Sequence, residues 1–255
     1  MLDDILRSVR ARLDEVRDRT ESLREEAVRR GPGLDAAAAL TAEGLSVIAE
    51  VKRRSPSAGP IDEDLDPTAL ARAYASGGAA AISVLTEPDH FAGSLDDLET
   101  VAAAVEVPVL RKDFVLDPAQ IWEARARGAD MVLLIVAILE DDALDELLVT
   151  AHESGLHALV EAHTEDEARR AVDVGARIIG VNNRDLATFD VDLATAERIR
   201  PVLGDDVIAV AESGVSSPDG ARRMAEAGYD AILVGEAAVR SGDPVGFVRS
   251  LREAP

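Results

Sequence analysis

Two lysines are the first candidates for chemistry in this chain. Lys52 and Lys112 are the only lysines among its 27 basic residues, and arginine supplies all the others. Each lysine follows a short apolar run of the kind that forms a buried parallel strand. An ammonium group can be tuned to give or take a proton near neutral pH, whereas a guanidinium stays charged. A composition poor in lysine could leave two by accident, but their matched placement favours a catalytic role.

The composition indicates an acidic α/β protein. The 255 residues carry a formal net charge of −22 and are 47% hydrophobic, which is ample for one α/β body. The negative charge opposes binding to nucleic acid or to an anionic membrane, because both need a cationic surface. It indicates either an adaptation to a salty cytoplasm or a merely acidic protein, and the sequence favours neither.

Signals for export, membrane insertion and thiol chemistry are missing from the sequence. It contains no cysteine, which excludes disulfides, thiolate zinc sites and a cysteine nucleophile. The apolar run from Met131 to Leu139 ends at three acidic residues, short of the roughly 18 residues of a membrane span. The first residues lack the basic-then-apolar pattern of a signal peptide. We therefore expect a cytoplasmic protein.

Short apolar runs alternate with longer amphipathic stretches in a βαβα rhythm from residue 46 onward. Eight runs are predicted as strands, at residues 46–51, 80–85, 107–111, 130–136, 157–161, 178–182, 207–211 and 230–234. Several of the helical stretches between them begin with Asp-Pro or Ser-Pro, a cap followed by a proline in the first turn. Eight parallel strands with crossovers predict a (β/α)8 TIM barrel. An open doubly wound sheet is the rival, but no Gly-x-Gly-x-x-Gly follows the first strand.

Residues 1–45 precede this rhythm and are predicted to form an N-terminal helical extension of a single TIM-barrel domain, with the barrel at 46–255. Ile5, Leu6, Val9, Leu13 and Val16 are spaced by three and four, as on an amphipathic helix. Such a helix could plug one end of the barrel or support a dimer, and we favour the plug. The oligomeric state expected is a monomer or weak homodimer.

Polar residues end most of the predicted strands. In a TIM barrel the active site lies at the carboxyl ends of the strands, so these residues should meet at one mouth. They are Glu50, Lys52, Lys112, Glu161, Asn182, Arg184, Glu212 and Ser213. Any one of them is commonly a structural ion pair, but eight such residues from five strands, lysines and acids among them, favour a catalytic site.

The last two strands end in residues suited to binding a phosphate. Gly214 follows Ser213, and Gly235 precedes a short helix expected at residues 236–239. Glycine lets backbone N–H groups approach an anion, and a helix N-terminus favours negative charge.

Seven blocks along the predicted barrel carry more specific patterns. They are Ile48–Ser57 (IAEVKRRSPS), Ile82–Glu87, Phe91–Leu95, Leu110–Phe114, Leu159–Glu161, Gly180–Leu186 (GVNNRDL) and Ala211–Gly214. In this order they closely resemble the signature blocks of the indole-3-glycerol phosphate synthase family, which acts in tryptophan biosynthesis. Ala58 departs from the family, because many members carry lysine there.

The resemblance implies the activity. The family closes the indole ring of 1-(2-carboxyphenylamino)-1-deoxyribulose 5-phosphate with loss of CO₂ and water, and it uses no metal and no organic cofactor. Such an enzyme must bind a phosphosugar-anthranilate substrate, orient its carboxylate, protonate a ketone oxygen and help a hydroxyl leave.

The resemblance also implies roles for the mouth residues. Lys112 corresponds to the general acid, and Lys52 to the residue that holds the anthranilate carboxylate and takes part in dehydration. Glu161 and Glu50 correspond to the carboxylates that move protons in later steps, with their division of labour open. The remaining expected contacts are Asn182 and Arg184 to the intermediate, Glu212 and Ser213 at the far wall, Ser55, Gly214, Gly235 and Glu236 to the phosphate, and Phe91 and Phe114 to the aromatic ring.

Three other functions are compatible with parts of the sequence. A Schiff-base aldolase also needs a lysine in a phosphate-binding barrel, but usually on the sixth strand, where this chain has Asn182. An isomerase of the same pathway usually uses a cysteine base, which is missing. A phosphosugar-binding barrel without catalysis needs neither the lysines nor the acids.

A metal site is not expected, because His152, His157 and His163 fall on a helix, at the start of a strand and beyond its end.

Overall fold

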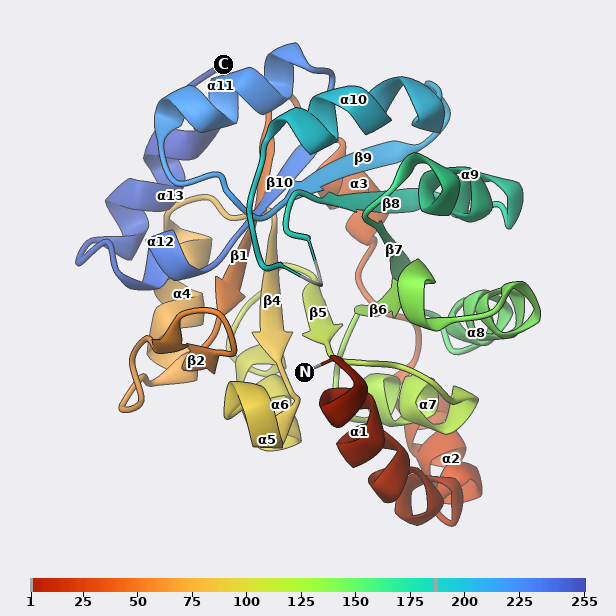
Figure 1. The fold of residues 1–255 in the computed structure, drawn as a ribbon. Coiled ribbons are helices and arrows are strands. Elements are labelled where there is room, and N and C mark those ends of the chain that lie inside the picture. Colours follow the sequence, from red (N-terminus) through yellow and green to blue (C-terminus); the bar gives the residue numbers. More distant parts are fainter. Residues whose placement is uncertain (1, 186–187) are drawn as a thin grey trace.

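A closed barrel of eight parallel strands forms the centre of the computed structural model, which describes residues 2–185 and 188–255. The strands are β1 (Ser46–Val51), β4 (Ala81–Leu85), β5 (Val109–Lys112), β6 (Met131–Ile135), β7 (His157–Ala162), β8 (Ile178–Asn182), β9 (Ile208–Glu212) and β10 (Ala231–Val234). Each strand pairs with its neighbour in the sequence, and β10 closes the barrel on β1 (Figure 1). The predicted TIM barrel is confirmed, and the open sheet is wrong.

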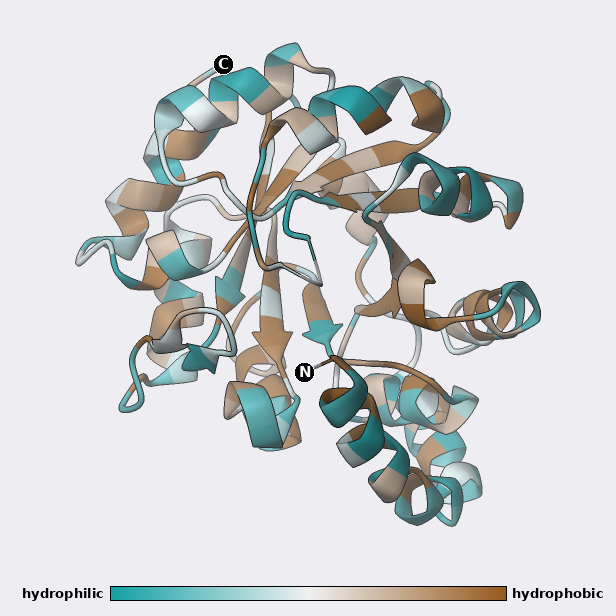
Figure 2. Ribbon diagram, in the orientation of Figure 1, coloured by the Kyte–Doolittle hydropathy of each residue, from teal (hydrophilic) through white to brown (hydrophobic). Residues whose placement is uncertain are grey.

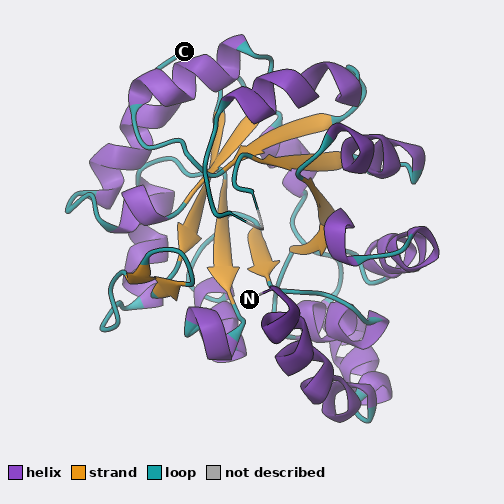
Figure 3. Ribbon diagram, viewed as in Figure 1, coloured by secondary structure: helices purple, strands orange, loops and turns teal. Residues whose placement is uncertain are grey.

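Helices between the strands surround the barrel (Figure 3). They are α4 (Pro67–Ser76), α5 (Pro88–Phe91), α6 (Leu95–Ala102), α7 (Pro118–Ala126), the 3₁₀ turn η1 (Val136–Ile138), α8 (Asp141–Glu153), α9 (Glu165–Asp173), α10 (Ala194–Leu203), α11 (Pro218–Glu226), α12 (Glu236–Val239) and α13 (Pro244–Arg252). The predicted Asp-Pro helix start is confirmed at α7, where the Asp117 side chain accepts a hydrogen bond from Ala119 N–H and Pro118 lies in the first turn.

Alternation along the strands produces two apolar layers. On β1 the side chain of Ile48 belongs to the cluster inside the barrel, whereas Val47 and Ala49 belong to the cluster between the sheet and the helices. Figure 2 shows the apolar strands at the centre and hydrophilic residues on the outer helices. The cluster inside the barrel fills the interior near the amino ends of the strands, and among the described residues Glu50, Glu161 and Glu212 lie at or near the carboxyl ends of their strands.

The N-terminal extension divides between the two ends of the barrel. It consists of α1 (Leu2–Arg17), α2 (Thr20–Arg30) and α3 (Ala36–Leu40). Ala36 and Leu40 of α3 are fully buried in the cluster at the base of the barrel interior. The predicted plug is therefore supplied by α3. The prediction for α1 is wrong, since this helix contacts α5 and α7 and brings its first turn to the mouth.

A small hairpin interrupts the loop after β1. Its strands β2 (Arg54–Ser55) and β3 (Gly59–Pro60) pair antiparallel beside the mouth.

Among helices of the described residues, none combines the length and the apolar character that crossing a bilayer requires. Leu186, the last residue of one signature block, lies outside the described residues.

Candidate functional site

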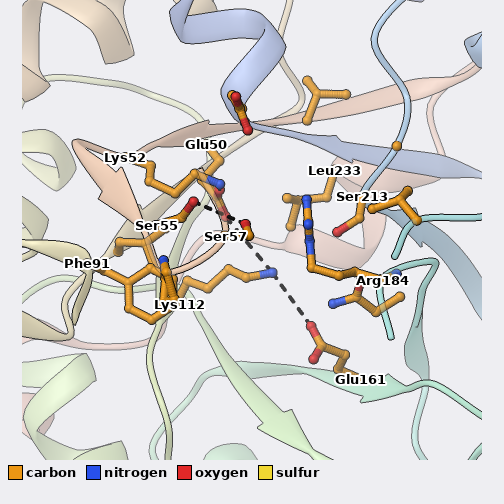
Figure 4. A pocket seen from close by; sticks show the side chains of 18 of the residues that line it. Glu50, Lys52, Ser55, Ser57, Phe91, Lys112, Glu161, Arg184, Ser213 and Leu233 are labelled. Atoms are coloured by element: carbon orange, nitrogen blue, oxygen red, sulfur yellow. Dashed lines mark hydrogen bonds and ion pairs between the residues drawn. The ribbon is translucent and has the colours of Figure 1, made fainter. Parts of the chain in front are cut away.

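The carboxyl ends of the strands enclose a cavity of about 590 Å³. All of the residues predicted for the site line it except Glu212, which is fully buried below. The cavity therefore combines the polar residues that end the strands with Ser55, Phe91, Phe114 and the two glycine-containing turns. Figure 4 shows Lys52, Lys112, Glu161 and Arg184 extending into the same space from different strands.

Lys112 is surrounded by three carboxylates. Its Nζ lies 2.6 Å from Oε2 of Glu212, 3.6 Å from Oε2 of Glu161 and 4.0 Å from Oε2 of Glu50. The four residues come from β5, β9, β7 and β1, so the barrel brings together groups far apart in the sequence. The dashed line from Lys112 to Glu161 in Figure 4 marks one of these pairs.

The three carboxylates change the pKa of Lys112. Burial alone lowers the pKa of an ammonium, but Glu212, Glu161 and Glu50 outweigh it and raise the pKa of Lys112 well above its usual value. The surroundings of Lys112 therefore favour its ammonium form rather than a pKa near neutrality. An ammonium of raised pKa is matched to a strongly basic acceptor oxygen.

The pKa values of the two carboxylates nearest Lys112 shift in opposite directions. Burial opposes ionisation of Glu161, but Lys112 and then His163 outweigh burial and lower its pKa. Burial dominates for Glu212, and its pKa is raised despite the contact with Lys112, with the neighbouring Glu161 adding to the effect. The surroundings thus favour the anionic form of Glu161 and the protonated form of Glu212. Pairs of acids separated in this way can divide base and acid roles.

Lys52 forms a second ion pair at the mouth. Its Nζ lies 2.5 Å from Oε1 of Glu50, which is 3% exposed. Burial raises the pKa of Glu50, but Lys52 and Lys112 together lower it below its usual value. Gly235 faces this pair closely, since a Cβ built there would lie 2.4 Å from Glu50 Oε1 and 3.1 Å from Lys52 Nζ. Glycine at this position leaves room for the ion pair.

The ends of β9 and β10 form the side of the cavity expected to hold phosphate. Ser213 and Gly214 have φ of 63° and 88°, which turns the chain sharply after β9. The predicted short helix is confirmed as α12, whose first residue, Glu236, lines the cavity. Across from it, the Ser55 hydroxyl accepts the N–H of Ala58 at 3.2 Å. The turn and α12 together offer backbone N–H groups to an anion.

Aromatic and polar walls complete the cavity. Phe91 and Phe114 stand with ring centroids 6.2 Å apart and planes inclined at 42°. On the other side, Asn182 Oδ1 accepts the backbone N–H of Arg184 at 3.0 Å. The Arg184 guanidinium donates to the carbonyl oxygen of Phe189 at 3.1 Å, which ties it to the loop after β8.

Several lining residues were missed from the sequence. Leu2 and Ile5 of α1 reach the mouth, while Ser57, Leu133 and Leu233 also line the cavity. Strand alternation could have indicated Leu133 and Leu233, since both point inward near strand ends. No sequence signal places the first turn of α1 there. The described residues contain no group of three or more His, Cys, Asp or Glu side chains able to hold a metal ion.

Comparison with known proteins gives consistent results. A family model described as indole-3-glycerol phosphate synthase matches residues 2–251. The indole-3-glycerol phosphate synthase of Mycobacterium avium is 55% identical over 254 residues, covering 98% of this chain and 93% of the relative. That of Streptomyces griseus is 51% identical over 253 residues, covering 98% and 94%. The structure of 3-hexulose-6-phosphate synthase from Salmonella typhimurium shares the fold, with a TM-score of 0.68, 14% identity and coverage of 82% and 98%.

Proposed function

The chain belongs to the indole-3-glycerol phosphate synthase family, and we propose that its barrel cavity performs the family's reaction with the residues described above. The activity is that of a carboxy-lyase of tryptophan biosynthesis, acting on a small phosphorylated substrate. The observation that carries the assignment of the site is the Lys112 ammonium, whose side chain is 15% exposed, held by Glu50, Glu161 and Glu212 at the base of the cavity.

The walls suggest how the substrate lies. The phosphate belongs at the turn after β9 and the start of α12, where backbone N–H groups and Ser55 face the cavity. The carboxylate of the anthranilate portion belongs beside Lys52, the ammonium nearer the hairpin after β1. Phe91 and Phe114 then flank the aromatic ring, and Asn182 and Arg184 hold the intermediate from the opposite wall. This placement directs the ketone oxygen toward Lys112.

The chemistry follows from that placement. The ring carbon that carries the carboxylate attacks the ketone carbon, and the ketone oxygen gains negative charge as the C–C bond forms. Lys112 donates a proton to this oxygen, whose alkoxide character matches an ammonium of raised pKa. The C–C bond to the carboxylate then breaks and CO₂ leaves. A carboxylate takes a proton from the former methylene carbon beside the nitrogen, and the neighbouring hydroxyl is protonated and leaves as water, which completes the indole; Glu161 and Glu50 are the proton carriers.

A direct assay tests this function. The purified enzyme is incubated with 1-(2-carboxyphenylamino)-1-deoxyribulose 5-phosphate, and indole fluorescence is followed. A fluorescent product formed at a rate proportional to enzyme supports the proposal. Borohydride trapping of a lysine with a keto-sugar phosphate, without indole formation, would instead support the Schiff-base aldolase interpretation.

Exchange of Lys52 for arginine should have a limited effect. Arginine keeps the positive charge beside Glu50 and can pair with the substrate carboxylate, so KM should stay close to that of the wild type. Turnover should fall by less than the ~10²-fold lower limit typical of losing a general acid or base. Steady-state kinetics measure both constants. A near-complete loss of turnover with binding intact would mean that Lys52 itself transfers a proton, and would exclude a role chiefly as carboxylate anchor.

Chelators should leave the activity unchanged. Lys112 and Lys52 occupy the carboxylates that could otherwise serve as metal ligands, and positioned ammonium groups supply the positive charge that the reaction needs. The measurement is the initial rate after dialysis against EDTA, compared with the same sample after addition of Mg²⁺ or Zn²⁺. Restoration of a lost rate by either ion would contradict the expectation.

Compartment and assembly complete the proposal. A biosynthetic enzyme that acts on a phosphorylated metabolite belongs in the cytoplasm. A monomer or weak homodimer is expected, without nucleic acid or membrane partners, because the net charge of −22 repels both. Light scattering coupled to size-exclusion chromatography, at two protein concentrations, measures the assembly state.

A further inference from the structure

A histidine lies directly behind one of the carboxylates that hold Lys112. His163 follows Ala162, the last residue of β7, and its side chain is 8% exposed. Its Nε2 lies 3.3 Å from Oε1 of Glu161, and its Nδ1 lies 3.2 Å from Oε2 of Glu167. The imidazole therefore stands between a carboxylate of the site and a carboxylate of α9. From the sequence, this histidine is considered only as a metal ligand, and its position makes it unsuitable for that role.

The start of α9 fixes Glu167 beneath the imidazole. The Thr164 hydroxyl accepts the N–H of Glu167 at 3.2 Å, and Glu167 Oε2 accepts the backbone N–H of His163 at 2.8 Å. This reciprocal arrangement resembles a capping box displaced by one residue. Glu167 is thus held against the Nδ1 edge of the ring, whereas the contact of Nε2 with Glu161 is an ion-pair distance of 3.3 Å without hydrogen-bond geometry.

Both nitrogens of the ring face negative charge, so protonation of both is favoured. Burial opposes the charge, but Glu161 and Glu167 outweigh it and raise the pKa of His163 to about 10. The other charged group beside Glu161 is Lys112 on β5, which also contacts Glu50 of β1 and Glu212 of β9. Glu161 consequently has a cation on each side, whereas Lys112 is the only cation that the described part of the chain places against Glu212.

We propose that His163 is a positioning residue, a buried imidazolium that keeps Glu161 ionised and turned toward Lys112. Glu161 and Glu212 both approach the Lys112 ammonium, and burial raises the pKa of each, so a second cation beside one of them favours ionisation of that one. His163 supplies this second cation for Glu161. The inference rests on the proposed function, because it assigns Glu161 a role as proton acceptor there.

The charge of His163 is measurable without any assay of activity. In the unliganded wild-type enzyme, ¹⁵N NMR of the histidine rings should show His163 protonated on both nitrogens at pH 8. His157, the first residue of β7, should be neutral there, because burial lowers its pKa. A neutral His163 ring at pH 7 would overturn the proposal. This readout stands even if the assay with the synthase substrate fails, which separates the two failures.

Kinetics of two substitutions test the consequence for Glu161. His163→Asn removes the cation near Glu161, so turnover should fall by ~10- to 10²-fold, part of a typical general base contribution, with KM nearly unchanged. His163→Gln has a longer side chain but is equally neutral, so it should lose turnover to a similar extent. In both variants the acid limb of the turnover profile should move to higher pH, because Glu161 loses the cation that lowers its pKa.

A matched control and a second variant keep the test decisive. His157→Asn changes a histidine at the other end of β7, 3.6 Å from Asp35, and should alter neither turnover nor the acid limb. Glu167→Gln leaves β7 intact but removes one of the two anions, and should lower the pKa of His163 in the NMR titration. The proposal is wrong if His163→Asn changes only thermal stability, or if Glu167→Gln leaves that titration unchanged.

Discussion

Replacement of Lys112 by arginine should abolish most of the turnover while substrate still binds. The guanidinium keeps the positive charge among Glu50, Glu161 and Glu212, so the ion pairs that hold these carboxylates are retained. It does not release a proton at any accessible pH. General acid catalysis is typically worth ~10²- to 10⁴-fold, and we expect kcat to fall within that range with KM changed only a few-fold.

Two further measurements make the Lys112 result interpretable. Thermal melting of Lys112→Arg should stay close to that of the wild type, because the charges at the base of the cavity still balance. Lys112→Met removes the charge and should lose turnover and also leave three carboxylates without their shared cation, which changes their titration. A Lys112→Arg variant with turnover within about tenfold of the wild type would show that charge alone is needed, and would remove Lys112 from the role of general acid.

The sequence was sufficient to predict most of the residues that meet at the mouth of the barrel. Its periodicity predicts eight strands, and in a barrel the residue that ends each strand is directed at a common mouth. Glu50, Lys112 and Glu161 could therefore be grouped before any distance was known. Asp-Pro caps such as that of α7 predicted helix starts for a similar reason, since a cap acts on N–H groups only two or three residues away.

The electrostatic character of the site could not be predicted in the same way. The pKa of Lys112 depends on the simultaneous approach of carboxylates from three other strands, and the approach of Glu212 to 2.6 Å is set by barrel geometry. His163 acts through Glu161 and Glu167, and a histidine beyond a strand end has no sequence signal for that contact. The position of α1 at the mouth depends on tertiary contacts with α5 and α7.

Gly180 should prove necessary for turnover although it carries no functional group. This glycine is on β8 inside the barrel, and a Cβ built there would lie 2.1 Å from Oε1 of Glu212 and 3.3 Å from a methyl carbon of Leu159. Gly180→Ala therefore requires Glu212 to move. Because a carboxylate at the end of a flexible side chain can rotate, the cost to stability should be at the low end of the ~1–3 kcal/mol typical of overpacking.

The functional cost of Gly180→Ala should be larger than its cost to stability. Glu212 Oε2 would leave its position 2.6 Å from Lys112 Nζ. The opposite pKa shifts of Glu161 and Glu212 depend on that arrangement and would be lost with it. We expect turnover to fall by ~10²-fold, the lower end of the range for a misplaced proton-transfer group. Gly220→Ala is the matched control, since its Cβ would meet only ordinary contacts at 3.6 Å or more.

A double-mutant cycle with Glu212→Ala identifies the route of the effect. If the added methyl group acts by displacing Glu212, then Gly180→Ala should cost turnover in the wild-type background and almost nothing once that side chain is shortened, because the methyl group then occupies the vacated space. Equal losses in both backgrounds would mean that the methyl group acts elsewhere, through Leu159 or the backbone of β8. Turnover and melting temperature measured for all four proteins separate these routes, since repacking around Leu159 lowers stability in both backgrounds, whereas displacement of Glu212 affects chiefly the rate.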